Sequence, residues 1–275
     1  MTINCKGHLL DLSTPKVMGI LNLTPDSFYD GGKFKNERSA LLQVERNMQH
    51  GMDILDIGAY STRPGAEDIS EDEELRRQNS VLQKITSEFP EVIISIDTFR
   101  SKVAKESLDC GAHIINDISA GKLDTEMMGL IARYQVPYIM MHMKGTPQTM
   151  KQLSTYEDLI KEVVLYFSER VAEARKRGIN DLIIDPGFGF AKNISQNFKL
   201  LHHLKVLKNL ELPILTGVSR KSMIYKTLST DVEAALNGTT ALNMAALING
   251  SSILRVHDVL EAKQCVTLYQ KLIEH

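Results

Sequence analysis

The sequence of 275 residues is poor in cysteine and has no long apolar run. Its three cysteines, Cys5, Cys110 and Cys265, lie far apart without CxxC spacing, which favours buried thiols in a reducing cytoplasm over a disulfide framework. No stretch approaches the roughly 20 apolar residues of a membrane span, and residues 1–8 lack the apolar segment of a signal peptide. We therefore expect a cytoplasmic protein without a membrane partner.

The chain also carries little net charge, −2 at neutral pH. This balance argues against bulk electrostatic attraction to nucleic acid or to an anionic membrane. The sequence contains no HxH, HExxH or Cys-His cluster, so it indicates no zinc site. Recognition of an anion must therefore come from local groups.

No low-complexity segment or Pro/Ser-rich linker divides the chain, and we interpret residues 1–275 as one domain. Short apolar runs alternate with longer amphipathic stretches. Several runs are apolar throughout, as expected of strands that are covered on both faces. The predicted strands are 16–22, 53–58, 92–97, 113–117, 137–142, 182–185, 213–217 and 252–256.

Helical patterns lie between these runs. Ser70 and Glu73 have the spacing of a capping box at a helix start. Residues 156–177 predict a long amphipathic helix that ends at Gly178. Asp258 is placed to cap the last helix.

Eight alternations of strand and helix in 275 residues predict an α/β fold, a single (β/α)8 TIM barrel. Residues 3–12 predict a short N-terminal hairpin across the bottom of the barrel. The alternative is a doubly wound open sheet. That fold normally has a Gly-rich turn after its first strand, and residues 22–26 contain no glycine.

Polar or otherwise special residues stand at the end of every predicted strand. A single Asp or Asn there often caps the next helix, but capping explains eight such ends poorly. Asp56 and Asp97 lie within the apolar pattern, and buried carboxylates need partners. The chemistry of a parallel barrel lies at the C-terminal ends of its strands, so we expect a polar ligand or a cation in this mouth. The residues are Asn22, Asp56, Asp97, Asn116 with Asp117, His142, Asp185, Gly217 with Lys221, and Arg255 with His257.

Two of these strand ends suggest particular ligands. Arg255 and His257 are two apart on a strand and face the same way, and the forked donors of arginine suit phosphate. Asp185 can accept hydrogen bonds from an amino group and an adjacent ring N–H. Phe188 or Phe190 either forms a wall for a flat ring or packs in the core.

The segment 217–222, Gly-Val-Ser-Arg-Lys-Ser, follows an apolar run and begins a helix. Free N–H groups at a helix start favour anions, and Lys221 adds a charge. His142 is compatible both with a ligand contact and with a core histidine. A Mg²⁺ bound by a phosphate-bearing substrate and protein oxygens is also compatible with the sequence, and Asn22 is the best candidate ligand.

Taken in order, these segments resemble the motifs of the dihydropteroate synthase family, the folate-pathway enzymes that sulfonamides target. The resemblance runs from about residue 16 to the C-terminus. One motif of the family commonly reads Asp-Ile-Gly-Gly-Glu-Ser, whereas this chain has Ala59 and Tyr60 before Ser61. The matching segments are 18–28, 56–58 with 61–66, 97–98, 115–117, 141–147, 185–190, 219–221 and 255–257.

The resemblance implies a (β/α)8 barrel, usually a homodimer, that joins 4-aminobenzoate to 7,8-dihydropterin-6-ylmethyl diphosphate. The products are 7,8-dihydropteroate and diphosphate. The implied pterin contacts are Asp97, Asn116, Asp185 and Lys221, and the implied diphosphate contacts are Arg255 and His257. The implied contacts of 4-aminobenzoate are Thr62, Arg63, Pro64, Phe190 and Ser222. Asn22 is the implied Mg²⁺ ligand, and Asp30, Asp97 and Lys221 are the implied catalytic residues.

Three other functions stay open at this stage. A methyltetrahydrofolate-dependent methyltransferase shares the barrel and the Asp and Asn contacts, but would not need the Arg255–His257 pair. A catalytically silent pterin-binding module would be expected to lack Asn22, Lys221 or Arg255. The third is another phosphate-handling barrel enzyme.

Overall fold

The computed structural model describes residues 1–23, 33–61 and 68–274, so the predicted site residues Asp30, Thr62, Arg63 and Pro64 lie outside the described residues. Eight parallel strands form one sheet in chain order, and a bridge between Ile184 and Ile214 joins its two edges. The predicted (β/α)8 barrel is confirmed, and the open sheet is wrong. The strands are β3 (Lys16–Asn22), β4 (Ile54–Gly58), β5 (Ile93–Asp97), β6 (Ile114–Asp117), β7 (Tyr138–Met141), β8 (Leu182–Asp185), β9 (Leu215–Thr216) and β10 (Ile253–Val256).

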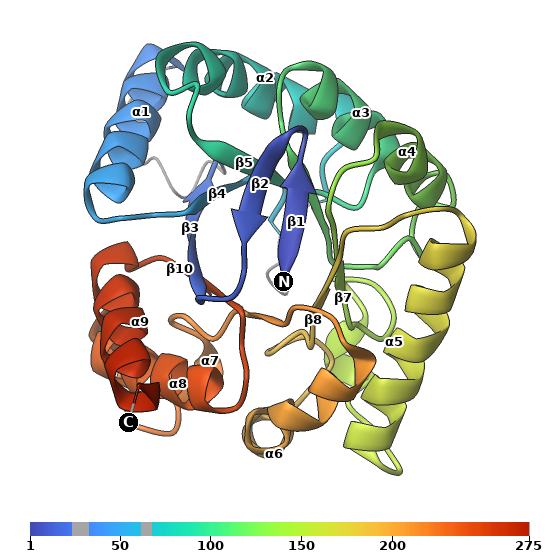
Figure 1. The fold of residues 1–275 in the computed structure, drawn as a ribbon, viewed down its shortest axis with the longest axis vertical. Helices are drawn as coiled ribbons and strands as arrows, with labels where there is room; N and C mark the ends of the chain where they lie inside the picture. Colours follow the sequence, from blue (N-terminus) through green and yellow to red (C-terminus); the bar gives the residue numbers. More distant parts are fainter. Residues whose placement is uncertain (24–32, 62–67, 275) are drawn as a thin grey trace.

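Helices follow the strands and surround the barrel (Figure 1). They are α1 (Lys33–Gln49), α2 (Glu71–Glu88), α3 (Ser101–Asp109), α4 (Met127–Tyr134), α5 (Leu159–Lys176), α6 (Ile194–His202), α7 (Ser222–Tyr225), α8 (Leu236–Ile248) and α9 (Val259–Ile273). Short 3₁₀ helices are η2 (Met150–Gln152), η3 (Leu204–Leu210) and η4 (Glu233–Ala235). Within the described ranges, no helix combines the length and the apolar character needed to cross a membrane.

Two of the three predicted helix ends are capped by the expected residue, and the third is not. Ser70 Oγ accepts a hydrogen bond from Glu73 N at 3.2 Å, and Gly178 follows α5 with φ of 83°. Glu73 gives only half of the capping box, because its carboxylate binds neighbouring arginines. The prediction for Asp258 is wrong: it stands before α9, but its carboxylate accepts from Arg220 at 2.6 Å instead of capping the helix.

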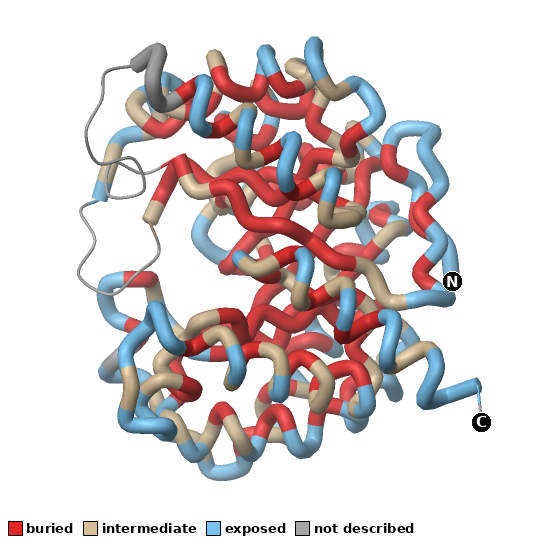
Figure 2. Tube along the Cα trace, turned by 90° about the vertical axis from the view of Figure 1, so that its left-hand side faces the viewer, coloured by how far each residue is buried: buried red, intermediate tan, exposed pale blue. Residues whose placement is uncertain are grey.

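The N-terminal hairpin closes the bottom of the barrel, as predicted. β1 (Thr2–Cys5) and β2 (His8–Asp11) pair antiparallel and lie across the barrel in Figure 1. Burial raises the pKa of the Cys5 thiol to about 12, as expected of a structural thiol. Cys265 is also buried, but Cys110 is only half-buried, so the prediction of buried thiols holds for two of three. Figure 2 shows the buried strands inside a shell of half-exposed helices.

Hairpin and barrel share one apolar layer, which we call the bottom cluster. It forms because the first inward residue of most strands is an aliphatic side chain. The cluster consists of Ile3, Cys5, Leu10, Leu12, Met18, Ile54, Ile114, Ile139, Ile183, Leu215 and Ile253.

Candidate active site

The opposite end of the barrel carries polar residues at one level. The strand register places Asn22 beside Gly58, Gly58 beside Asp97, and Asp97 beside Asn116. Farther round the barrel, Asp185 ends β8 opposite Met141. The parallel sheet therefore gathers side chains that are more than 150 residues apart in sequence.

Two carboxylates of this end, the fully buried Asp56 and the half-buried Asp97, are paired with Arg255. Its Nε donates to Asp56 Oδ2 and its Nη2 to Asp97 Oδ2, each at 2.6 Å. Asp56 also accepts from Ser95 Oγ at 2.7 Å and from Asn116 Nδ2 at 3.2 Å. The cation that the sequence required for these acids is thus part of the chain itself.

This pairing decides the charges at the centre of the mouth. Burial raises the pKa of Asp97, and the guanidinium of Arg255 opposes that rise. Burial lowers the pKa of Arg255, but Asp56 and Asp97 more than compensate, so its pKa lies above the ordinary value. Nη1 of Arg255 makes no hydrogen bond to any described residue, which leaves two N–H groups for a ligand.

Asp185 and Lys221 bring opposite charges to the mouth, near enough to influence each other's pKa without a direct ion pair among the described contacts. Asp185 Oδ1 accepts from Gly187 N at 2.7 Å, and Oδ2 has no hydrogen bond within the described part of the chain. Burial raises the pKa of Asp185, and Lys221 opposes the rise. Burial lowers the pKa of Lys221 to about 8, while the Asp185 charge acts in the other direction. Lys221 Nζ donates to the Phe188 carbonyl and lies 5.1 Å from the centre of the Phe190 ring.

The two phenylalanines of the β8–α6 turn have different surroundings. Phe188 is fully buried in the main core, so only its carbonyl reaches the mouth. Phe190 is half-buried beside Lys221. Of the two aromatic residues considered from the sequence, Phe190 is therefore the one placed to contact a ring.

His142 is a core histidine with a buried partner. Its Nδ1 lies 3.0 Å from Nζ of Lys192, which also donates to the carbonyls of Gly187 and Phe190 at 2.9 and 3.0 Å. Burial lowers the pKa of His142 to about 2 and that of Lys192 to about 7. Lys192 holds the turn behind Phe190, and sequence reasoning missed it because one lysine in a turn carries no periodic signal.

The segment 217–222 differs from the predicted cationic helix start. α7 spans only four residues, so its N-terminus offers a weak dipole. Arg220 turns away to Asp258, and Ser219 Oγ lies 3.0 Å from His257 Nδ1. Of the cationic residues in this segment, Lys221 alone contacts the rim of the mouth, beside Phe190.

Hard oxygen atoms converge above Gly58. A Cβ on Gly58 would stand 3.7 Å from Asp97 Oδ2 and 3.8 Å from Asn22 Oδ1. The missing side chain therefore leaves a space with an amide and a carboxylate oxygen beside it. Oxygen donors of this kind suit Mg²⁺.

An apolar layer, which we call the apolar wall, lies over the ends of β5–β8. It adjoins the polar groups in the chain, because Phe99 and Ile118 each stand two residues after Asp97 and Asn116, and Phe190 stands five residues after Asp185. The wall consists of Ile118, Met141, Met143, Met150 and Ala191, with Phe99 and Phe190 packed against them. Polar groups beside an apolar wall suit a flat, hydrogen-bonding ring.

The sequence named most of this constellation but missed three parts of it. Asp56 was seen as a polar strand end without a role, and it is the buried acid that anchors Arg255. Lys192, which holds the turn behind Phe190, was not assigned to the site, and neither was Tyr60, whose hydroxyl lies 3.0 Å from Gln148 Nε2 at the rim. Ser222 and His257 lie at its edge, on the segments after β9 and β10.

Comparison with known proteins agrees with this geometry. Residues 18–257 match the family model described as pterin binding enzyme. A dihydropteroate synthase from Synechocystis is 46% identical over 246 residues, which cover 88% of this chain and 85% of that protein.

Solved structures of the same enzyme match over the full chain. The dihydropteroate synthase of Yersinia pestis with a sulfonamide drug complex superposes with a TM-score of 0.94 at 39% identity, covering 100% of both chains. The Xanthomonas albilineans enzyme with 4-aminobenzoic acid gives 0.93 at 36%, covering 100% of this chain and 98% of that one. Its complex with 7,8-dihydropteroate gives 0.90 at 34%, covering 100% of both. The chain therefore belongs to the dihydropteroate synthase family of pterin binding enzymes.

Proposed function

We propose that this chain condenses 7,8-dihydropterin-6-ylmethyl diphosphate with 4-aminobenzoate, giving 7,8-dihydropteroate and diphosphate. Relatives that cover nearly the whole chain carry the name of this activity. The observation that carries the proposal in this chain is the opposite charges of Asp185 and Lys221, one acceptor and one donor beside an apolar wall.

The pterin ring is recognised by hydrogen bonds at its polar edge. Asp185 Oδ2 accepts from the ring amino group and the adjacent N–H, while Lys221 donates to a ring acceptor. Asn116 and Asp97 complete the set from the neighbouring strands. Phe190 and the rest of the apolar wall cover the ring faces.

Departure of diphosphate is assisted by positive charge at the mouth. Arg255 offers its Nη1 donors to the diphosphate while Asp56 and Asp97 fix the orientation of the guanidinium. His257 offers a second contact from the segment after β10. Asn22 would hold a substrate-bound Mg²⁺, which neutralises phosphate charge when bound.

Charge that develops on the pterin is stabilised by nearby carboxylates. Loss of diphosphate leaves positive charge on the exocyclic methylene, which the dihydropterin ring delocalises. Asp97 and Asp185 favour that charge electrostatically, with Asp30 as a further acid from the part of the chain outside the described residues. The arylamine of 4-aminobenzoate then attacks the methylene carbon, a dissociative order of events. An aromatic amine is nucleophilic without a strong protein base.

The aminobenzoate contacts are proposed from five residues. Phe190 and Ser222 adjoin Lys221, which supports their assignment beside the pterin end. The other three, Thr62, Arg63 and Pro64, belong to the chain outside the described ranges.

One assay tests the reaction. Diphosphate release from the pterin substrate by the purified chain should require both Mg²⁺ and 4-aminobenzoate, with one dihydropteroate formed per diphosphate. Release that is independent of 4-aminobenzoate, or no release at all, would refute the proposed function. A pterin that lacks the diphosphate serves as the matched inactive substrate.

The proposed enzyme is a cytoplasmic homodimer. Helix α8 contains no charged residue, and apolar side chains of α8 and α9 are exposed. They include Ile248, Leu260, Leu268 and Leu272, exposed by 56, 40, 63 and 61%. Sedimentation should give a dimer, and Leu268→Glu should shift it towards monomer; a monomeric parent chain would refute the assembly.

The three free cysteines suit a reducing compartment, which supports the cytoplasmic assignment.

A further inference from the structure

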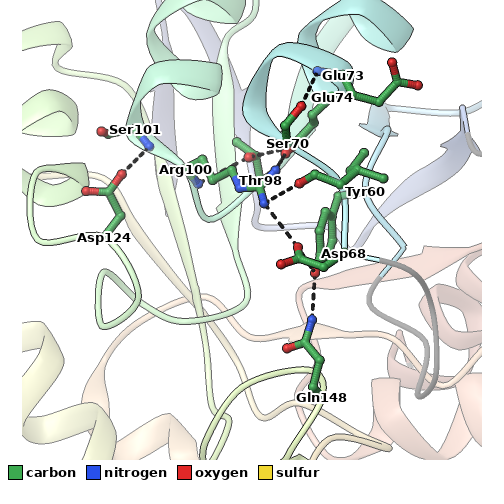
Figure 3. A network of polar contacts seen from close by, with 11 residues as sticks. Tyr60, Asp68, Ser70, Glu73, Glu74, Thr98, Arg100, Ser101, Asp124 and Gln148 are labelled. Carbon is green, nitrogen blue, oxygen red and sulfur yellow. Dashed lines mark hydrogen bonds and ion pairs between the residues drawn. The ribbon is translucent and has the colours of Figure 1, made fainter.

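Tyr60 joins three loops at the rim of the barrel (Figure 3). Its hydroxyl lies 3.0 Å from Asp68 Oδ1 on the β4–α2 connection and 3.0 Å from Gln148 Nε2 on the β7–α5 connection. Its ring packs edge to face on Phe99, which follows β5, with the ring centres 5.2 Å apart.

The Tyr60 hydroxyl donates one of its two hydrogen bonds and accepts the other. Burial raises the pKa of Tyr60, so the phenol stays protonated, donates to Asp68 and accepts from Gln148. Tyr60 itself is only 8% exposed, although Asp68 and Gln148 are surface residues. A buried hydroxyl with both a donor and an acceptor contact is costly to displace.

A second set of contacts makes the far side of the junction rigid. The guanidinium of Arg100 lies 5.1 Å from the Tyr60 ring centre and donates to Glu74 at 2.8 Å and to the Ile69 carbonyl at 2.7 Å. Glu74 is fully buried and also accepts from Thr98 Oγ1 at 2.8 Å. Phe99 and Tyr60 therefore rest on a fixed base, whereas Gln148 reaches them from a separate loop.

That separate loop carries part of the apolar wall. Met143 and Met150 belong to the wall, and Gln148 is two residues from Met150. Met143 also borders an open pocket of about 410 Å³, whose lining includes Lys144 and the α5 residues Glu162 and Tyr166. The start of the loop is tied to α5 by Lys144, which donates to Glu162 at 2.6 Å, and the segment before Met150 is tied to the opposite rim by Gln148.

We propose that Tyr60 is a positioning residue for the pterin end of the site. Through Gln148 it holds the β7–α5 loop, and through Phe99 it holds the opposite edge of the same apolar wall. The inference rests on the proposed function, because it assigns the wall to the pterin ring. Tyr60 itself touches neither the reacting atoms nor any of the charged groups of the mouth described above.

The test removes the hydroxyl while keeping the ring. Tyr60→Phe should raise KM for the pterin diphosphate about threefold to tenfold and leave kcat within about twofold. Gln148→Leu should raise the same KM to a similar extent. If one hydrogen bond transmits the effect, the double variant should be no worse than the Tyr60→Phe variant. Calorimetric titration with the pterin alone should show the same weakening without turnover.

Two matched controls separate positioning from stability. Tyr134→Phe removes a hydroxyl that binds Asp109 at 2.6 Å at the end of α4, and Gln152→Leu changes an exposed glutamine of the same β7–α5 loop. Both should leave KM unchanged, and thermal unfolding should show every variant fully folded at the assay temperature. An unchanged pterin KM and affinity in Tyr60→Phe, or additive effects in the double variant, would overturn the inference. Failure of the parent chain to make dihydropteroate would instead reject the proposed function.

Discussion

The two ends of the barrel are built from the same strands but from opposite chemistry. At the bottom, Ile54, Ile139 and Ile183 meet the N-terminal hairpin in a dry layer. At the top, a few residues along the same strands, Asp56 and Asp185 are buried among charges. The difference teaches that the top is not arranged for stability, since buried carboxylates cost free energy that aliphatic residues do not.

Because the two ends differ in chemistry, we expect mutations at the two ends to have different effects. Substitutions in the bottom cluster should lower stability and leave catalysis per folded molecule intact. Substitutions of ligand-facing groups at the top should do the reverse. Arg255 is the exception, because it serves both the buried acids and the proposed diphosphate site.

The largest effect is expected for Arg255→Ala. Removing the guanidinium leaves Asp56 and Asp97 buried without their cation, which should cost about 3–5 kcal/mol of unfolding free energy. Affinity for the pterin diphosphate should also fall, more than for a pterin without diphosphate. Urea denaturation and titration of both ligands measure this. Arg220→Ala, which breaks a more exposed pair with Asp258, is the control; equal stability losses would contradict the special position of Arg255.

In the bottom cluster, Ile139→Ala should cost about 3 kcal/mol of stability. The side chain is fully buried, and its removal leaves a cavity under the hairpin. At a temperature where the variant stays folded, kcat/KM should equal that of the parent. A drop in kcat/KM without a drop in the denaturation midpoint would break the separation of the two ends.

For Lys221→Ala we expect kcat/KM to fall more than tenfold, about 1.4 kcal/mol or more in transition-state free energy. Stability should hardly change, because burial already disfavours the charged lysine. Steady-state kinetics with varied pterin substrate give the first number and thermal unfolding the second. Lys226→Ala, an exposed lysine just after α7, should behave as the parent. Near-normal turnover of Lys221→Ala would remove the role assigned to Lys221.

The smallest effect is a dependence on pH. The pKa of Lys221 is lowered to about 8 in the folded chain, so kcat/KM should fall as pH rises through about 8. The unfolded chain keeps this proton to about pH 10.4, and hence stability should rise between these values as the buried charge is lost. Lys221→Arg stays charged and should flatten the basic limb of the profile. If kcat/KM of Lys221→Arg still falls as pH rises, the fall would be due to the titration of another group, such as Lys192.

The sequence predicted the fold well because its signal is local. Each apolar run is a strand within two residues of its predicted ends, since a strand covered on both faces needs continuous apolar side chains. The ring of polar strand ends was likewise visible residue by residue. The pairing of these residues was not, because the contact between Asp56 and Arg255 joins residues 199 apart.

Local rules failed where a tertiary partner competed for the same group. Asp258 had the position of a helix cap, but Arg220 takes its carboxylate. The motif 217–222 indicated an anion-binding helix start, but only one turn of helix forms there. For Tyr60, the sequence showed only a departure from the family motif. Its proposed role depends on its contacts with Gln148 and Phe99, which come from other loops.

The central claim is that the polar end of the barrel binds the pterin ring through Asp185. Asp185→Asn keeps the size of the side chain and an oxygen for Gly187 N, but loses the charge that the ring donors require. Calorimetric titration with a dihydropterin that lacks diphosphate measures ring binding alone. We predict binding to the parent chain and at least about tenfold weaker binding to Asp185→Asn. Equal affinities would contradict the assignment of this end of the barrel as the pterin site.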